Sequence, residues 1–73
     1  MQLPPFQRAL GERVRRLRKK KGWSQEEFAH RCGIQRSYMG VVERGEYNFT
    51  LKTVYKLAKG LDTSVSALLK GIL

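Results

Sequence analysis

Glycine residues divide this chain into short segments, and this division limits its possible folds more than any other feature. Gly22, Gly33 and Gly45 each follow a segment with helical apolar spacing, at the position where helices commonly end. The segments between them have room for about two or three helical turns. No run of alternating apolar and polar residues is long enough to indicate a strand. The sequence therefore predicts an all-α fold built from short helices.

The first two predicted helices have clear start signals. Pro4 and Pro5 suit the entrance of a helix, because proline tolerates the first helical positions. The helix that follows ends before Gly22, and its apolar stripe consists of Phe6, Leu10, Val14 and Leu17. Ser24 and Glu27 form an S-x-x-E capping box, which predicts the start of a second helix about two turns long.

Three more helices complete the prediction. The third covers residues 35–44 and ends at Gly45. Thr50 can cap a fourth helix, whose expected inward residues are Leu51, Val54, Tyr55, Ala58 and Leu61. Thr63 or Ser64 can cap a short fifth helix that carries Val65, Leu68 and Leu69. We expect five helices in a single domain that covers residues 1–73.

The chain's size excludes several kinds of protein. Its 73 residues can bury only a small core, and the lone Cys32 cannot form a disulfide within the chain. No segment has the roughly 18 apolar residues of a membrane-spanning helix, and no secretory signal is present. We therefore expect a soluble protein of the cytoplasm, with Cys32 as an inert core thiol and His30 on the surface.

Positive charge is concentrated at one end of the chain. The net charge is +9 at neutral pH. Residues 1–23 carry eight basic side chains and one acidic side chain, whereas residues 24–45 carry three of each. A field of this strength attracts polyanions, but the neutral middle of the chain must have another role.

That middle segment resembles a known family. Four stretches carry the resemblance: Gly-Trp-Ser-Gln-Glu-Glu-Phe-Ala from residue 22, Gly-Ile from 33, Ser-Tyr-Met from 37 and Val-Glu-Arg-Gly from 42. They are similar to the phage repressor and Cro family of helix-turn-helix domains. The resemblance extends over roughly residues 10–70, and it includes the controller proteins of restriction-modification systems. It implies a compact, five-helix, lambda-repressor-like fold with the helix-turn-helix at about residues 24–44.

The resemblance also implies roles for individual residues. The helix over residues 35–44 would enter the DNA major groove, and its base-contacting side would carry Gln35, Arg36, Ser37, Gly40 and Val41. These types suit that role, because Arg pairs with guanine, Gln with adenine and Val meets the thymine methyl. The phosphate contacts would come from Gln25, Tyr38, Asn48 and Thr50. Arg18 and Glu43 match an ion pair that joins the first helix to the end of the third.

The C-terminal end predicts a dimer. Residues 64–73 include the apolar side chains Leu68, Leu69, Ile72 and Leu73 near the end of the chain. We expect these side chains to form the interface of a homodimer that binds a two-fold related operator. Two features depart from the family pattern. Asp62 and Thr63 replace the usual glycine and apolar residue, which predicts a shorter, looser or differently packed link, and Gly60 is expected to weaken the fourth helix.

Other functions remain as alternatives at this point. An antitoxin that represses its own operon and also binds a protein partner uses the same type of domain. The basic first helix also suits a membrane-binding or partner-binding module. An enzyme ranks last, because the sequence has no paired catalytic carboxylates, no His-centred triad and no metal-ligand spacing. We expect no cofactor, no metal and no small-molecule substrate.

Overall fold

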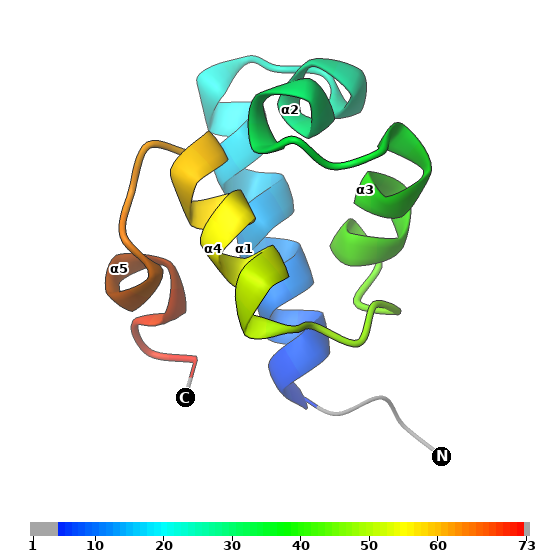
Figure 1. Cartoon of the computed structure of the whole chain (residues 1–73). Coiled ribbons are helices and arrows are strands. Elements are labelled where there is room, and N and C mark those ends of the chain that lie inside the picture. The colour runs from blue at the N-terminus through cyan, green and yellow to red at the C-terminus, as the bar shows by residue number, and fades with distance from the viewer. Residues whose placement is uncertain (1–4, 73) are drawn as a thin grey trace.

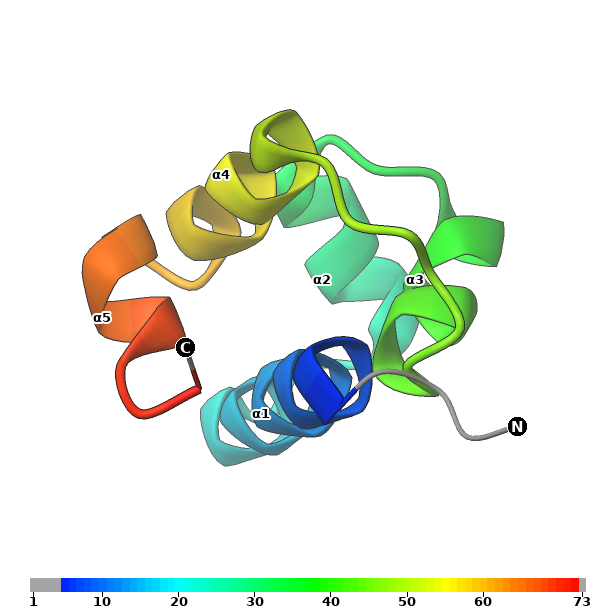
Figure 2. The ribbon, with the colours of Figure 1, turned by 90° about the horizontal axis from the view of Figure 1, so that it is seen from below.

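The computed structural model describes residues 5–72 and contains five helices, as predicted (Figure 1). They are α1 (Pro5–Lys21), α2 (Gln25–Cys32), α3 (Arg36–Glu43), α4 (Leu51–Gly60) and α5 (Val65–Leu69). No strand occurs among these residues, so the all-α prediction is confirmed. Figures 1 and 2 show α3 and α5 on opposite sides of the molecule.

The predicted helix starts are formed by local hydrogen bonds. Ser24 Oγ accepts a bond from the backbone N–H of Glu27 at 3.0 Å, and Glu27 Oε1 accepts one from the N–H of Ser24 at 2.9 Å. This reciprocal pair is the expected capping box. Thr50 caps α4, and Ser64 rather than Thr63 caps α5. The starts of α2, α4 and α5 therefore follow from interactions between residues three apart in sequence.

The core combines residues from all five helices. Twelve buried apolar side chains form one cluster: Leu10, Val14, Phe28, Ala29, Cys32, Met39, Val42, Val54, Leu57, Ala58, Leu61 and Leu68. Burial of apolar area on this scale is the main stabilising contribution in so small a chain. No helix within residues 5–72 has both the length and the apolar character needed to cross a membrane.

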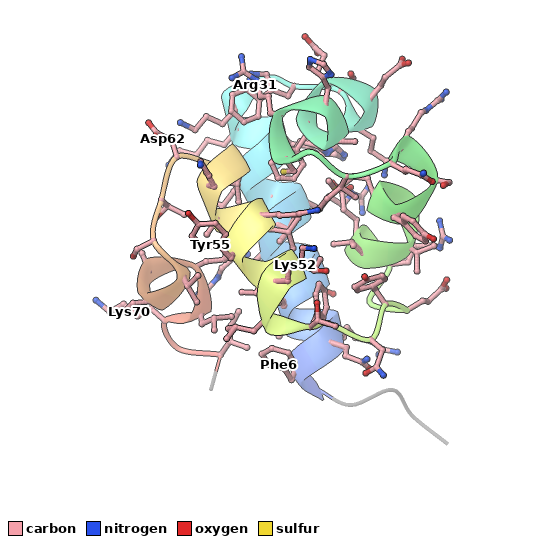
Figure 3. All side chains as sticks on the ribbon, in the orientation of Figure 1. Phe6, Arg31, Lys52, Tyr55, Asp62 and Lys70 are labelled. Atoms are coloured by element: carbon pink, nitrogen blue, oxygen red, sulfur yellow. The ribbon has the colours of Figure 1, made fainter. Side chains whose placement is uncertain are left out.

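One part of the core prediction is wrong. Leu51 is 77% exposed and Tyr55 is 57% exposed, whereas Leu57 is fully buried. Figure 3 shows Tyr55 on the outer side of α4. The 3.6-residue period fits two neighbouring stripes on α4, and its packing against α2 and α5 selects the stripe that contains Leu57.

Two glycines inside helices allow close packing between helices. A Cβ atom at Gly11 would lie 3.0 Å from the backbone N of Gly45 and 3.1 Å from the carbonyl O of Glu43, so α1 can approach the end of α3 only without a side chain there. A Cβ at Gly60 would lie 3.2 Å from the Cα of Cys32. Gly60 thus allows α2 and α4 to meet closely, which the sequence pattern did not predict.

The link between α4 and α5 is closed by Asp62 and Thr63. Asp62 takes the left-handed conformation with φ of 60°, which glycine usually supplies after a helix. Its N–H donates to the carbonyl of Lys59 at 3.0 Å, and the N–H of Thr63 donates to the carbonyl of Ala58 at 2.9 Å. The two replacements therefore keep the hydrogen bonds of a regular helix end.

Candidate nucleic-acid interface

The turn between α2 and α3 fixes the direction of α3. Gly33 adopts the left-handed conformation with φ of 69°, and its N–H donates to the carbonyl of His30 at 3.2 Å. The N–H of Ile34 donates to the carbonyl of Ala29 at 3.0 Å, and the Ile34 side chain packs against the core. This anchored turn sets the second helix of the pair at a defined angle to the first.

α3 has a buried side and an outward side. Met39, Val42 and Glu43 are buried, so the prediction that Met39 and Val42 belong to the core is confirmed. The five predicted base-contacting residues lie elsewhere on the segment. Gln35, Arg36 and Ser37 are exposed, whereas Gly40 and Val41 are half-buried. Gln35 occupies the N-cap position without a capping hydrogen bond, which leaves its amide group available for an external partner.

A buried ion pair holds the C-terminal end of α3. Arg18 Nε lies 2.6 Å from Glu43 Oε2, and Arg18 Nη2 donates to Glu43 Oε1 at 3.0 Å. The side chains are 10% and 3% exposed. Arg18 Nη1 also donates to the carbonyl of Trp23 at 2.8 Å. The paired groups therefore connect α1, the α1–α2 junction and α3, as a structural role requires.

Gln25, the first of the predicted phosphate-contacting residues, belongs to the same network. Its Nε2 donates to Glu43 Oε1 at 3.1 Å, which leaves the second Nε2 hydrogen for another acceptor. Gln25 also begins α2, where the first backbone N–H groups of a helix favour anions. Gln25 therefore lies beside the C-terminal end of α3 and at the N-terminus of α2, a position suited to a phosphate.

The other three predicted phosphate-contacting residues lie on α3 and in the segment that follows it. Tyr38 is 51% exposed, and its ring meets the ring of Tyr47 edge-on at a centroid distance of 6.2 Å. Asn48 is exposed, and its Oδ1 accepts a hydrogen bond from Gln7 Nε2 at 3.4 Å. Thr50 is exposed as well, but its hydroxyl already accepts the N–H of Thr53.

Arg44 is a candidate that the sequence interpretation missed. It is exposed directly after α3, and its Nη1 lies 3.1 Å from the position that a Cβ of Gly40 would take. Its Nε lies 3.1 Å from Glu46 Oε1 in an exposed ion pair. Because Arg44 follows Gly40 by four residues, the helical period alone could have placed it on the same side as the predicted base contacts.

The four predicted dimer residues have different positions. Leu68 is only 1% exposed and closes the monomer core, so it offers almost no surface to a second copy. Leu69 and Ile72 are half-buried and pack against the core, while Leu73 lies outside the described residues. Arg13 Nη1 donates to the carbonyl of Leu68 at 3.1 Å and to that of Lys70, which ties the end of α5 to α1.

The fold shifts the pKa of Cys32 and of Glu27. Burial raises the pKa of Cys32 to about 12, so this side chain is a neutral thiol at physiological pH. The hydrogen bonds from Ser24, first from its backbone N–H, lower the pKa of Glu27. Within residues 5–72, no three His, Cys, Asp or Glu side chains come together as a metal site.

Comparison with known proteins agrees with this geometry. The HTH_3 helix-turn-helix family model matches residues 14–68. The control protein C.SmaI of Serratia marcescens is 50% identical over 60 residues, which cover 82% of this chain and 71% of that protein. A hypothetical transcription factor of Neisseria meningitidis is 42% identical over 60 residues, which cover 82% of this chain and only 57% of that protein.

A solved structure supports the same assignment. The restriction-modification controller protein C.AhdI from Aeromonas hydrophila superposes with a TM-score of 0.79 at 46% identity. The match covers 84% of this chain and 92% of that one. The family resemblance predicted from the sequence is confirmed. This chain belongs to the HTH_3 helix-turn-helix family, whose members are DNA-binding transcriptional regulators and not enzymes.

Proposed function

We propose that this chain is a sequence-specific regulator that binds double-stranded DNA as a homodimer, with one α3 helix in the major groove at each half-site. The observation that carries this proposal is the fixed presentation of α3. The Arg18–Glu43 ion pair and the buried Met39 and Val42 hold one side of the helix. Its opposite side carries short or hydrogen-bonding side chains, which can approach base edges.

Base and phosphate contacts have different roles in this proposal. Gln35, Arg36, Ser37, Gly40 and Val41 contact bases, and Arg44 extends this set. Gln25, Tyr38, Asn48 and Thr50 contact phosphates and set the position of α3 on the duplex. The basic residues of α1 raise affinity for any DNA through phosphate neutralisation, so binding falls steeply as salt concentration rises.

The dimer is proposed to form through the α5 side of the molecule. Leu69 and Ile72 retain partial exposure there, and Leu73 follows them in sequence. Because α3 lies on the other side, a two-fold axis beside α5 separates the two recognition helices (Figure 2). The Cα extents of one copy are 32 × 24 × 22 Å, which is compatible with half-sites about 34 Å apart. The homology of C.SmaI and C.AhdI, a control protein and a controller protein, supports a regulatory role for this chain.

Selection of bound sequences from random duplex DNA tests the proposal. Repeated rounds at physiological salt should enrich a two-fold related consensus, and sedimentation of the selected complex should give two chains per duplex. The chain with Arg36→Ala and Gln35→Ala serves as a matched control that retains the basic α1. Absence of any enriched sequence, or enrichment that persists unchanged in this control, would contradict the assignment of α3 to base recognition.

A further inference from the structure

Tyr47 lies between α3 and α4 and has no part in the proposed DNA contacts. Its ring meets the Tyr38 ring edge-on at a centroid distance of 6.2 Å, and its hydroxyl oxygen lies 3.2 Å from Thr53 Oγ1. Thr53 Oγ1 in turn lies 3.1 Å from Thr50 Oγ1. One half-buried side chain therefore connects two of the proposed phosphate contacts, Tyr38 and Thr50.

The start of α1 fixes the position of Tyr47. Gln7 Nε2 donates to the carbonyl of Tyr47 at 2.8 Å and to Asn48 Oδ1 at 3.4 Å. The Phe49 ring meets the Tyr47 ring edge-on at 5.4 Å, and it also meets the Phe6 ring of α1 at 6.1 Å. Figure 1 shows the segment between α3 and α4 where it passes the start of α1. These contacts restrain both the backbone and the ring of Tyr47.

A bound phosphate gives the chain of three hydroxyl groups a single direction. Phosphate oxygens of DNA accept hydrogen bonds, so a Thr50 hydroxyl that binds one must donate its only hydrogen to it. Thr50 Oγ1 must then accept from the Thr53 hydroxyl, in addition to the Thr53 N–H that it already accepts. The Thr53 hydroxyl has then used its own hydrogen and accepts one from Tyr47. Tyr47 is therefore the first donor of the chain.

The ring of Tyr47 restrains Tyr38. A hollow with a volume of about 230 Å³ lies between α3 and α4, and Tyr38, Tyr47 and Thr53 are among the residues that line it. Tyr38 borders this hollow and is 51% exposed, so the edge contact with Tyr47 limits the directions that its ring can take. A side chain that is held before binding loses less conformational freedom when it meets its partner.

We propose that Tyr47 is a positioning residue for DNA binding. Its hydroxyl directs the Thr50 hydroxyl towards one phosphate, and its ring holds Tyr38 for another. Tyr47 itself touches no DNA in this arrangement. The inference rests on the proposed function, because it requires the phosphate contacts of Tyr38 and Thr50. Positioning of this kind raises the affinity for every DNA sequence and leaves the choice of bases to α3.

Two substitutions of similar shape test the hydroxyl chain. Tyr47→Phe and Thr53→Val each break it, but both keep the Tyr47 ring and the backbone N–H that Thr50 accepts. In titrations of the selected operator duplex, each change should weaken binding about three- to tenfold. The double variant should bind no more weakly than the weaker single variant, because both changes remove the same link. Tyr55→Phe is the control, since it removes a hydroxyl from the exposed side of α4 and should leave the affinity unchanged.

Tyr47→Leu tests the ring. It removes the edge contact with Tyr38 as well as the hydroxyl, so it should weaken operator binding at least about threefold more than Tyr47→Phe does. This additional loss should disappear when both chains also carry Tyr38→Leu, because the ring of Tyr47 then has no tyrosine to hold. Circular dichroism melting confirms that every variant is folded at the temperature of the titration.

Neutral phosphates distinguish positioning from a general loss of structure. Each duplex of a series carries one methylphosphonate in the operator, and this replacement weakens wild-type binding where a phosphate is contacted. Tyr47→Phe should be less sensitive than the wild type at one phosphate of each half-site and equally sensitive elsewhere. A general loss of structure would instead reduce the sensitivity evenly. The ratios of affinity among single-base variants of the operator should stay as in the wild type.

Several results would overturn the proposal. Losses that multiply in the Tyr47→Phe, Thr53→Val double variant would show a direct contact between Tyr47 and DNA. A changed preference at one base pair in Tyr47→Phe would show a base contact. Unchanged affinity of Tyr47→Phe, or an equal loss in Tyr55→Phe, would show that the hydroxyl chain has no role in binding. In all these cases the wild type still binds its operator, so the proposed function stands. A wild type that binds no duplex DNA would refute the proposed function itself.

Discussion

Glu43 receives hydrogen bonds from two side chains that are far from it in sequence. Its Oε1 accepts one from Arg18 Nη2 at 3.0 Å and one from Gln25 Nε2 at 3.1 Å, while its Oε2 lies 2.6 Å from Arg18 Nε. One carboxylate at the end of α3 is thus bound to α1 and to the start of α2. The proposed recognition helix and the proposed phosphate contact share this anchor.

Removal of the Glu43 carboxylate should destabilise the fold. Glu43→Ala leaves the Arg18 guanidinium buried without its partner, so we expect a loss of about 3 to 5 kcal/mol in the free energy of unfolding. Urea denaturation followed by circular dichroism measures this change. Glu46→Ala is the control, because it breaks an exposed pair with Arg44 and should cost at most about 1 kcal/mol. Equal stability of the two variants would contradict a structural role for Glu43.

Gly60→Ala should destabilise the chain although alanine favours helices. A Cβ atom at residue 60 would press on Cys32, at 3.2 Å from its Cα and 3.3 Å from its Cβ. Overpacking of this kind costs about 1 to 3 kcal/mol, which exceeds the helix-propensity gain of about 1 kcal/mol. Thermal melting of Gly60→Ala, Cys32→Ala and the double variant measures the coupling. Strictly additive effects would show that the two residues do not press on each other.

Asp62→Gly should stabilise the end of α4. Asp62 has a φ of 60°, where a side chain on Cβ is strained and glycine is not. Both backbone hydrogen bonds of the turn remain available to glycine. We expect a gain of roughly 0.5 to 1 kcal/mol, measured as a rise in melting temperature. A fall in melting temperature would indicate that the Asp62 side chain contributes more than its backbone conformation costs.

Arg36→Ala and Gln25→Ala should affect DNA binding in different ways. Arg36 is proposed to contact a base, so its loss should reduce the binding free energy for the preferred sequence by about 1 to 3 kcal/mol. It should also relax the preference at one base pair. Gln25 is proposed to contact a phosphate, so its loss should weaken binding to all DNA sequences equally. Binding titrations on the selected operator and its single-base variants separate the two patterns. Because Gln25 also bonds Glu43, melting curves must show that this variant is folded.

Acidification should loosen the start of α2 through Glu27. Its pKa is lowered in the fold by the hydrogen bonds from Ser24, so the native state binds the proton less readily than the unfolded chain does. Its contribution to stability is therefore complete above the ordinary Glu pKa of 4.5 and is lost as pH falls through the lowered value. Glu27→Gln should be less stable than the wild type at neutral pH, and the difference should shrink in acid.

The control for this pH effect is Glu26→Gln, which removes a carboxylate from the same helical turn but leaves the capping box intact. Denaturation series between neutral and acidic pH compare the two variants with the wild type. A stability difference between Glu27→Gln and the wild type that stays constant at every pH would contradict the assigned role of the carboxylate.

The sequence by itself determined the five helices and most of their ends. Ser24 with Glu27, Thr50 and Ser64 act on backbone groups three residues away, and Gly33 ends α2 through its own backbone freedom. Such interactions are local, so their pattern is visible in the order of residues. The same local period placed Gln35, Arg36 and Ser37 away from the buried side of α3.

Only the tertiary structure decided which surfaces meet. Leu51 and Leu57 are both apolar and both fit a helical stripe on α4, but packing buries Leu57 and leaves Leu51 exposed. The bond from Gln25 to Glu43 likewise joins separate helices, and the close approach at Gly60 depends on where α2 lies. Helix propensity acts over about four residues, whereas these contacts depend on how whole helices pack together. Tertiary packing therefore determines which of the two apolar stripes on α4 is buried, because the 3.6-residue period fits both.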